Sequence, residues 1–336
     1  MLLCGYSQVK DMQGQPDEGL RHATEALRVA EQTEDRGLSL VVLQALIASH
    51  TESGRLREAL RLAEQGLLLA PEDPRLGVKL LGYSPYAWMM GFKARLLVHM
   101  GHLEEARDAI ERCVALSHAL GETEAPGTWY PVAALVADYV GDADRALGYA
   151  RRAVEIAEKT GHSFGRAVAH LALGVALKTK GESSEAVRMF EQALVVSRER
   201  RTGLQFEAWV LAVLAEARLA NGEPDRARAT ANEAVAAAHQ TPLFECVARL
   251  ALAHVLLRTE GLAARNTIEA ALTRAQTLVD ETGAEVYAPF IHLERAELAR
   301  LAGEAPARER QLREAQRLFS AMGATARAEQ VAREVA

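Results

Sequence analysis

Cysteine is scarce in this sequence, and the patterns that metals, disulfides and membranes require are missing. The 336 residues include only Cys4, Cys113 and Cys246, which are odd in number and far apart. No CxxC pair occurs, so the sequence indicates neither a disulfide framework nor a zinc site. No run approaches the roughly 18 apolar residues that a membrane-spanning helix needs. These absences favour a reducing, cytoplasmic location, with no bound metal and no membrane contact.

Neither sign of charge dominates the sequence, and aromatic residues are few. The chain has 39 Lys and Arg against 45 Asp and Glu, mixed along its whole length, for a formal charge of −6. This balance excludes a broad basic surface, so we expect no nucleic-acid partner. Aromatic residues make up 5% of the chain, whereas the strong helix formers Ala, Leu, Glu and Arg are abundant. Because the residues typical of strands are not enriched, the composition predicts an all-α fold.

Several short motifs of nucleotide binding and metal catalysis are also absent. The sequence contains no GxxxxGK[ST], GxGxxG or HExxH pattern, and GxSxG occurs once, at Gly161–Gly165. The closest histidine pair, His99 and His102, flanks Gly101, and a turn glycine there directs the two side chains apart. We therefore interpret both as ordinary turn histidines. With no nucleophile–base pair and no metal-ligand set, we expect no catalytic residue, no cofactor and no enzymatic activity.

Two interleaved series of glycines run along the chain. In the first series the steps are 39 to 47 residues, and its members are Gly14, Gly54, Gly101, Gly141, Gly181, Gly222, Gly261 and Gly303. The second series has one double step, where Thr241-Pro242 replaces a glycine, and consists of Gly37, Gly77, Gly121, Gly161, Gly203, Gly283 and Gly323. Glycine adopts positive φ without penalty, so each predicts the end of a helix. The offset of about 20 residues leaves room for one helix of roughly 16 residues between glycines.

Small residues recur at fixed distances from the first series. Five residues after the glycine stand Ala59, Ala106, Ala146, Ala186 and Ala227, and seven residues before it stand Ala94, Ala134, Gly174, Ala215 and Ala296. This pattern resembles the tetratricopeptide repeat (TPR), most cleanly in residues 84–240. Two features depart from the family. The period is near 40 where the family has about 34, and its proline after the second helix is mostly absent, with Pro71 and Pro74 coming nearest.

The longer repeat resembles the C-terminal helical regions of bacterial signalling ATPases, both LuxR-type regulators and adenylate cyclase–ATPase fusions. The resemblance implies an all-α, right-handed superhelical TPR-like solenoid of antiparallel helix pairs. We expect residues 1–323 to form about eight pairs that turn at the first glycine series, and residues 324–336 to form a capping helix. We also expect the chain to be the C-terminal part of a longer protein.

Large aromatic residues begin several of the predicted first helices. Trp88, Trp209 and Phe290 lie 13 residues before a first-series glycine, and Trp129 lies 12 before. In the TPR family this position begins the helix whose inner face lines the concave groove. Carried over by position, the same face holds Arg95, Asp138, Lys178, Glu216, Arg258, Glu297 and Arg300. Two interpretations stay open: these residues anchor and orient a bound peptide, or the aromatics fill gaps between repeats.

Repeats without catalytic motifs favour a non-enzymatic scaffold for protein binding. We expect a protein or peptide segment to lie in the concave groove and to serve signal transduction. That segment comes from a partner or from an ATPase or cyclase domain of the same chain. The alternative is a small-ligand sensor, in which the superhelix encloses a metabolite and Trp88, Trp129 and Trp209 stack on its ring.

Overall fold

The computed structural model describes residues 1–70, 73–238 and 241–335, and these residues are almost entirely helical. They contain no β-strand, which confirms the predicted all-α class. The first half of the chain forms α1 (Leu2–Met12), α2 (Pro16–Ala30), α3 (Arg36–Glu52), α4 (Leu56–Leu69), α5 (Val78–Leu81), α6 (Pro85–His99), α7 (Leu103–Ala119), α8 (Ala125–Val140) and α9 (Ala143–Thr160). The second half forms α10 (Ser163–Thr179), α11 (Ser183–Arg200), α12 (Glu207–Ala220), α13 (Pro224–Ala237), α14 (Pro242–Thr259), α15 (Arg265–Thr282), α16 (Ala288–Leu301), α17 (Ala305–Ala321) and α18 (Thr325–Val335).

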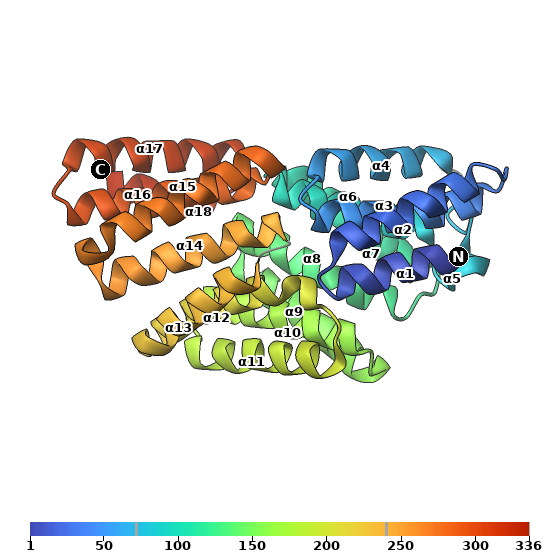
Figure 1. Cartoon of the computed structure of the whole chain (residues 1–336), viewed down its shortest axis with the longest axis horizontal. Helices are drawn as coiled ribbons and strands as arrows, with labels where there is room; N and C mark the ends of the chain where they lie inside the picture. The colour runs from blue at the N-terminus through green and yellow to red at the C-terminus, as the bar shows by residue number, and fades with distance from the viewer. Residues whose placement is uncertain (71–72, 239–240, 336) are drawn as a thin grey trace.

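Consecutive helices form antiparallel pairs, in which we call the first helix A and the second helix B. The A helices are α1, α3, α6, α8, α10, α12, α14 and α16, and each packs on the B helix that follows it. Successive pairs stack into a TPR-like solenoid, which runs in Figure 1 from blue N-terminal helices through green and yellow to red. Three 3-10 turns, η1 (Leu204–Phe206), η2 (Gly261–Ala264) and η3 (Glu285–Tyr287), lie between helices.

Two sequence predictions concern residues at or near the parts of the chain that the structure does not describe. The division into repeats 1–323 and a capping helix 324–336 stays a prediction; α18 follows Gly323, and Ala336 lies outside the described residues. Pro71, which we compared with the family's proline, also lies outside them. Among the helices that the structure describes, none combines the length and apolar composition of a membrane span.

The first-series glycines follow the expected geometry, whereas Gly77 and Gly203 of the second series have positive φ but stand before α5 and η1 instead of ending a helix. Every first-series glycine has positive φ, between +57° and +97°, and follows an A helix. In the second series, the prediction that Gly37 ends a helix is wrong, because Gly37 lies in the first turn of α3. Asp35 caps that helix by accepting hydrogen bonds from the backbone N–H groups of Gly37 and Leu38. A Cβ at Gly37 would lie 3.3 Å from the backbone of Gly77, so the glycine permits a close approach.

Small residues let the helices of each pair approach closely. The alanines five residues after the turn glycines are completely buried, namely Ala59, Ala106, Ala146, Ala186 and Ala227. Gly174 of α10 packs directly under the ring of Phe190 in α11, where a Cβ would lie 2.4 Å from the ring. Because interiors are close-packed, larger side chains at these positions would push the helices apart.

The solenoid completes one superhelical turn in five helix pairs. The Thr202 hydroxyl, just before the sixth pair, lies 3.9 Å from the sulfur of Met12 at the end of the first A helix. The Tyr287 hydroxyl, before the eighth pair, lies 3.3 Å from Nδ1 of His99 at the end of the third A helix. These contacts join residues 190 and 188 positions apart. The end of an early A helix thus meets the start of the A helix five pairs later.

The surroundings of the turn glycines reflect the five-pair superhelical turn. At Gly14, Gly54, Gly101 and Gly141, an added Cβ would lie within 4 Å of residues that belong to helix pairs five or more positions later in the chain. Among the described residues, nothing lies within that distance at Gly181, Gly222 or Gly303. Within residues 1–335 no helix pair lies five positions after these turns, and no described residue covers them.

We predict that Arg327 fastens the last helix to the first superhelical turn. It donates hydrogen bonds to the carbonyls of Tyr139 (3.0 Å) and Asp138 (2.8 Å), and its guanidinium lies 5.4 Å from the Phe290 ring centroid. Arg327→Ala should lower the free energy of unfolding by about 1–3 kcal/mol in urea titrations, because buried carbonyls lose their donors. Arg333→Ala, an exposed residue of the same helix, should change it by less than about 0.5 kcal/mol. Equal effects of the two substitutions would contradict this role.

Candidate functional site

The first superhelical turn surrounds a partly open cavity of about 850 Å³. Its wall consists of residues of α1, α3, α6, α8 and α10, the short helix α5, the end of α9, the start of α12 with η1, and the loops before α6, α8 and α10. The contact between Met12 and Thr202 joins the first helix to the sixth pair, so the ring of A helices is closed. The volume lies within the range of roughly 300–1,000 Å³ that is typical of ligand pockets.

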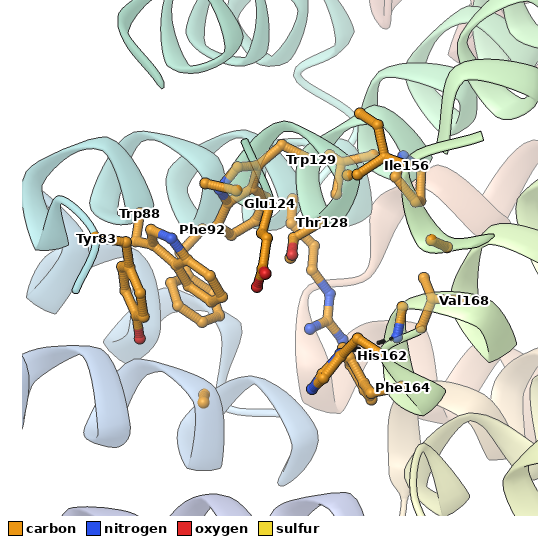
Figure 2. A pocket seen from close by; sticks show the side chains of 18 of the residues that line it. Tyr83, Trp88, Phe92, Glu124, Thr128, Trp129, Ile156, His162, Phe164 and Val168 are labelled. Carbon is orange, nitrogen blue, oxygen red and sulfur yellow. Dashed lines mark hydrogen bonds between the residues drawn. The ribbon is translucent and has the colours of Figure 1, made fainter. Parts of the chain in front are cut away.

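Aromatic side chains form one wall of the cavity. Tyr83 stacks on Trp88 with ring centroids 4.5 Å apart, and the edge of Trp129 meets Trp88 at 5.0 Å. Phe92 packs edge-on against Trp129 at 5.5 Å. Figure 2 shows Tyr83, Trp88 and Phe92 together on one side of the cavity, opposite His162, Phe164 and Val168. Offset and edge-to-face contacts of this kind hold aromatic rings in fixed positions.

All three tryptophans of the chain line the cavity. Trp209 stacks on Phe244 with centroids 5.7 Å apart and an interplanar angle of 7°. Trp129 lies flat on Gly91, where an added Cβ would be 2.4 Å from the indole ring. The tryptophans therefore pack between helix pairs and also border the cavity, so their role as anchors of a bound peptide stays a prediction.

A buried ion pair crosses the wall between α3 and α6. Arg95 Nη2 lies 2.8 Å from Glu52 Oε1, and the two side chains are 15% and 3% exposed. The Arg95 guanidinium also lies 5.2 Å from the Phe206 ring centroid. Arginine suits this place because its planar group binds a carboxylate and stacks on an aromatic face at once.

Asp11 of α1 lies buried beside the cavity and is protonated at neutral pH. Burial raises the pKa of its carboxyl to about 8, and the charge of Glu52 adds to the rise, although a hydrogen bond from Ser49 opposes it. The Ser49 hydroxyl donates to Oδ2 at 2.8 Å, while Oδ1 has no hydrogen-bond partner among the described residues. The carboxyl packs against Gly19, where a Cβ would lie 2.1 Å from Oδ1.

His99 is not the surface turn histidine that we expected. It is 1% exposed and lines the cavity, whereas His102 is exposed. Burial lowers the pKa of His99 to about 3, and the nearby Arg95 lowers it further in the same direction. The ring is therefore neutral, and its contact with Tyr287 connects the cavity wall to the second superhelical turn.

The structure brings four of the eleven predicted site residues to the cavity, namely Trp88, Arg95, Trp129 and Trp209. The other seven lie outside it, and most contact each other or the neighbouring A helix. Lys178 of α10 pairs with Glu216 of α12, and Arg258 of α14 lies 3.1 Å from Glu294 of α16. The remaining contacts are Asp138 with Thr179, Glu297 with Arg300, and Phe290 with Phe319. A role of these seven in partner binding stays a prediction.

Sequence reasoning missed several residues of the cavity. The predicted charges stand three or six residues before a turn glycine, and in the first pair these two positions hold Gln8 and Asp11. Both line the cavity, so the same register, extended to the first pair, identifies them. Glu122 also lines it but lies in the loop between two pairs, where no repeat position points to it.

The comparisons with known proteins agree with this architecture. The family model "Tetratricopeptide repeat" matches residues 128–199, which span α8 to α11. This segment is similar to the tetratricopeptide repeat, and the fold of the described residues is a TPR-like helical solenoid. No curated protein matches this chain in sequence, and the resemblance to signalling ATPases stays a prediction.

Solved structures of similar shape cover most or nearly all of this chain. A Rap protein complexed with Competence and Sporulation Factor is 12% identical, with a TM-score of 0.66 over 99% of this chain and 95% of that one. NprR in complex with its cognate peptide NprX is 14% identical, with a TM-score of 0.56 over 99% and 97%. Aspartyl phosphate phosphatase F from Bacillus subtilis is 10% identical, with a TM-score of 0.57 over 88% and 75%. At these identities the likeness shows the fold alone.

We predict that Gly91→Ala displaces Trp129 from its place in the wall. The new methyl group would overlap the indole ring, whose nearest atoms lie 2.4 Å from the Cβ position. The ring must move, so the tryptophan emission spectrum should shift and the protein should lose about 1–3 kcal/mol of stability. Gly148→Ala is the matched control, because it lies in α9 with nothing within 4 Å, and it should stabilise by up to about 1 kcal/mol. Unchanged emission in Gly91→Ala would refute the packing described.

Asp11 should make the protein less stable as the pH rises. Its pKa is about 8 in the folded chain and about 3.9 when unfolded. Between these two pKa values the folded state holds one more proton than the unfolded state. The protonated Asp11 carboxyl therefore contributes its full stabilisation below pH 4, and this stabilisation falls progressively as the pH rises to 8. The loss approaches 1.4 kcal/mol per pH unit.

Asp11→Asn removes this dependence. In urea titrations, the stability of the variant minus that of the parent chain should increase steadily between pH 5 and pH 8. Ionisable groups that both proteins share contribute equally and cancel in this difference. Asp17→Asn, an exposed control in α2, should show a flat difference. A flat difference for Asp11→Asn would mean that the carboxyl is ionised in the folded chain.

Proposed function

We propose that this chain is a non-enzymatic regulatory module that binds a peptide segment inside its first superhelical turn. The cavity carries the proposal. Its wall is the concave face of the A helices, and it includes all three tryptophans and Arg95. Rigid aromatic anchors beside a few oriented polar groups are the usual components of a peptide-binding surface.

The solved structures of similar shape support the proposal. A Rap protein is described with Competence and Sporulation Factor bound, and NprR is described with its cognate peptide NprX. In a regulator, a peptide that prefers one conformation of the superhelix shifts the population toward it. We further propose that the segment comes from a partner or from an ATPase or cyclase domain of the same chain, in the cytoplasm.

A second candidate function is a sensor for a small molecule. The cavity favours it because it is surrounded by a closed ring of helices, and its volume of about 850 Å³ suits a metabolite. Trp88, Trp129 and Trp209 all border this space and could stack on a ring of the bound molecule. The two candidates share one site and differ in the chemistry of the occupant.

Thermal shift and tryptophan emission together test the proposed function. An equimolar pool of random hexapeptides should raise the melting temperature of the full chain and change its emission, because every tryptophan lines the cavity. Ala48→Phe, which fills the cavity from α3, should abolish both effects, and Ala321→Phe, on the exposed side of α17, should preserve both. If metabolites stabilise the chain and peptides do not, the second candidate replaces the first. Undiminished peptide binding to Ala48→Phe would place the site elsewhere.

A further inference from the structure

The cavity wall offers hydrogen-bond acceptors that nothing in the protein satisfies. The second carboxylate oxygens of Glu52 and Glu122 have no hydrogen-bond partner among the described residues, and neither do the amide oxygens of Gln44 and Gln205. Glu52 is 2% exposed and Gln44 is 1% exposed. All four residues line the cavity. Buried acceptors without partners are rare in folded proteins, so this group indicates a site for a donor from outside the chain.

The donors of the same wall are largely engaged. Arg95 gives its guanidinium to Glu52 and to the face of Phe206, and the Gln44 amide donates to the Tyr83 hydroxyl at 2.8 Å. The backbone N–H of Ser84 donates to Glu122. The buried donors without a partner in this wall, among the described residues, are the indole N–H groups of Trp88 and Trp129, and the exposed Arg75 also borders the cavity. A ligand that brings cationic donors therefore fits better than one that brings acceptors.

The charge of the wall points the same way. Glu52, Glu122 and Glu124 line the cavity as carboxylates, against the cations Arg75 and Arg95. Arg95 pairs with Glu52, and no ion pair joins Glu122 or Glu124 to a cation among the described residues. Figure 2 shows Glu124 between the aromatic wall and the wall of His162 and Phe164. A cation placed there lies beside acidic side chains that have no ion-pair partner among the described residues.

The aromatic wall also favours a cation over an anion. Tyr83, Trp88, Phe92 and Trp129 form one continuous cluster, with centroid separations of 4.5 Å to 6.2 Å. The faces of aromatic rings attract ammonium and guanidinium groups, most strongly for tryptophan. The edges of the same rings offer apolar surface to a neighbouring aliphatic or aromatic group.

We propose that the cavity selects a peptide that carries an ammonium or guanidinium group next to an apolar side chain. The cationic group donates to Glu52 or to Glu122, whose contacts lie near opposite ends of α6, and the apolar side chain packs on Trp88 and Trp129. This inference rests on the proposed function, which it deepens by naming the chemistry of the peptide. A free aromatic amine has the same two chemical groups, so the test must separate the two sources.

Affinity selection with the full chain tests the charge preference. The immobilised protein is incubated with an equimolar library of random hexapeptides, and the retained peptides are sequenced by mass spectrometry. We expect Lys, Arg or a free amino terminus beside an apolar residue to be enriched about tenfold over the input, because charge-assisted hydrogen bonds in a buried site discriminate strongly. A second arm adds phenethylamine to the loaded protein. Displacement of the peptides by equimolar phenethylamine would identify a free amine as the preferred ligand and overturn the peptide assignment.

Paired carboxylate substitutions show whether the preference arises in the cavity. The double variant Glu52→Gln/Glu122→Gln keeps hydrogen-bond acceptors but removes the charge, and it should retain peptides without enrichment of basic residues. The matched control Glu309→Gln/Glu314→Gln changes two carboxylates of α17, remote from the cavity, and should keep the enrichment. Circular dichroism checks that both variants fold.

The outcomes separate this inference from the proposed function. Retained peptides with no charge preference, or with a preference for Asp and Glu, overturn the cationic specificity and leave peptide binding intact. Enrichment of basic residues that survives in Glu52→Gln/Glu122→Gln also overturns it, because the carboxylates of the cavity are then not the cause. No retention of any peptide contradicts the inference and the proposed function together.

Discussion

The close approach of neighbouring helices is the constraint on which the rest of this structure depends. A single helix pair cannot bury its apolar face alone and must stack on the next pair. Here completely buried alanines and Gly174 occupy the crossings, so the pairs pack tightly. The resulting superhelix turns fully in five pairs, and its second turn touches its first through contacts such as Tyr287 with His99.

That pitch converts a concave groove into a cavity. Residues of several A helices border this cavity together, so a molecule that bound there would contact several helix pairs at once. The helices that hold it also carry the contacts between turns, since His99 borders the cavity and meets Tyr287 of the second turn. Occupancy of the cavity and closure of the superhelix therefore share residues, which is the arrangement that a ligand-regulated module requires.

The repeat architecture could be predicted from the sequence because its cause is local. Positive φ at residues such as Gly101 and Gly141, and small residues at the crossings, repeat with each pair. Gly37 misled this reasoning, since its role is a close approach to Gly77 rather than the end of a helix. The cavity was only partly predictable. Trp88 and Arg95 follow the register, but contacts between residues 188 to 190 positions apart depend on the superhelical pitch, which no single repeat encodes.

The most direct test of the account measures whether the two superhelical turns touch in solution. The native cysteines are buried, so spin labels can be attached selectively to cysteines introduced at the exposed positions His102 and Thr325. Gly101 contacts Met322 in the closed superhelix. The account predicts a single, narrow distribution of short distances in double electron–electron resonance. A broad distribution centred at long distances would show an open solenoid without this cavity and would contradict it.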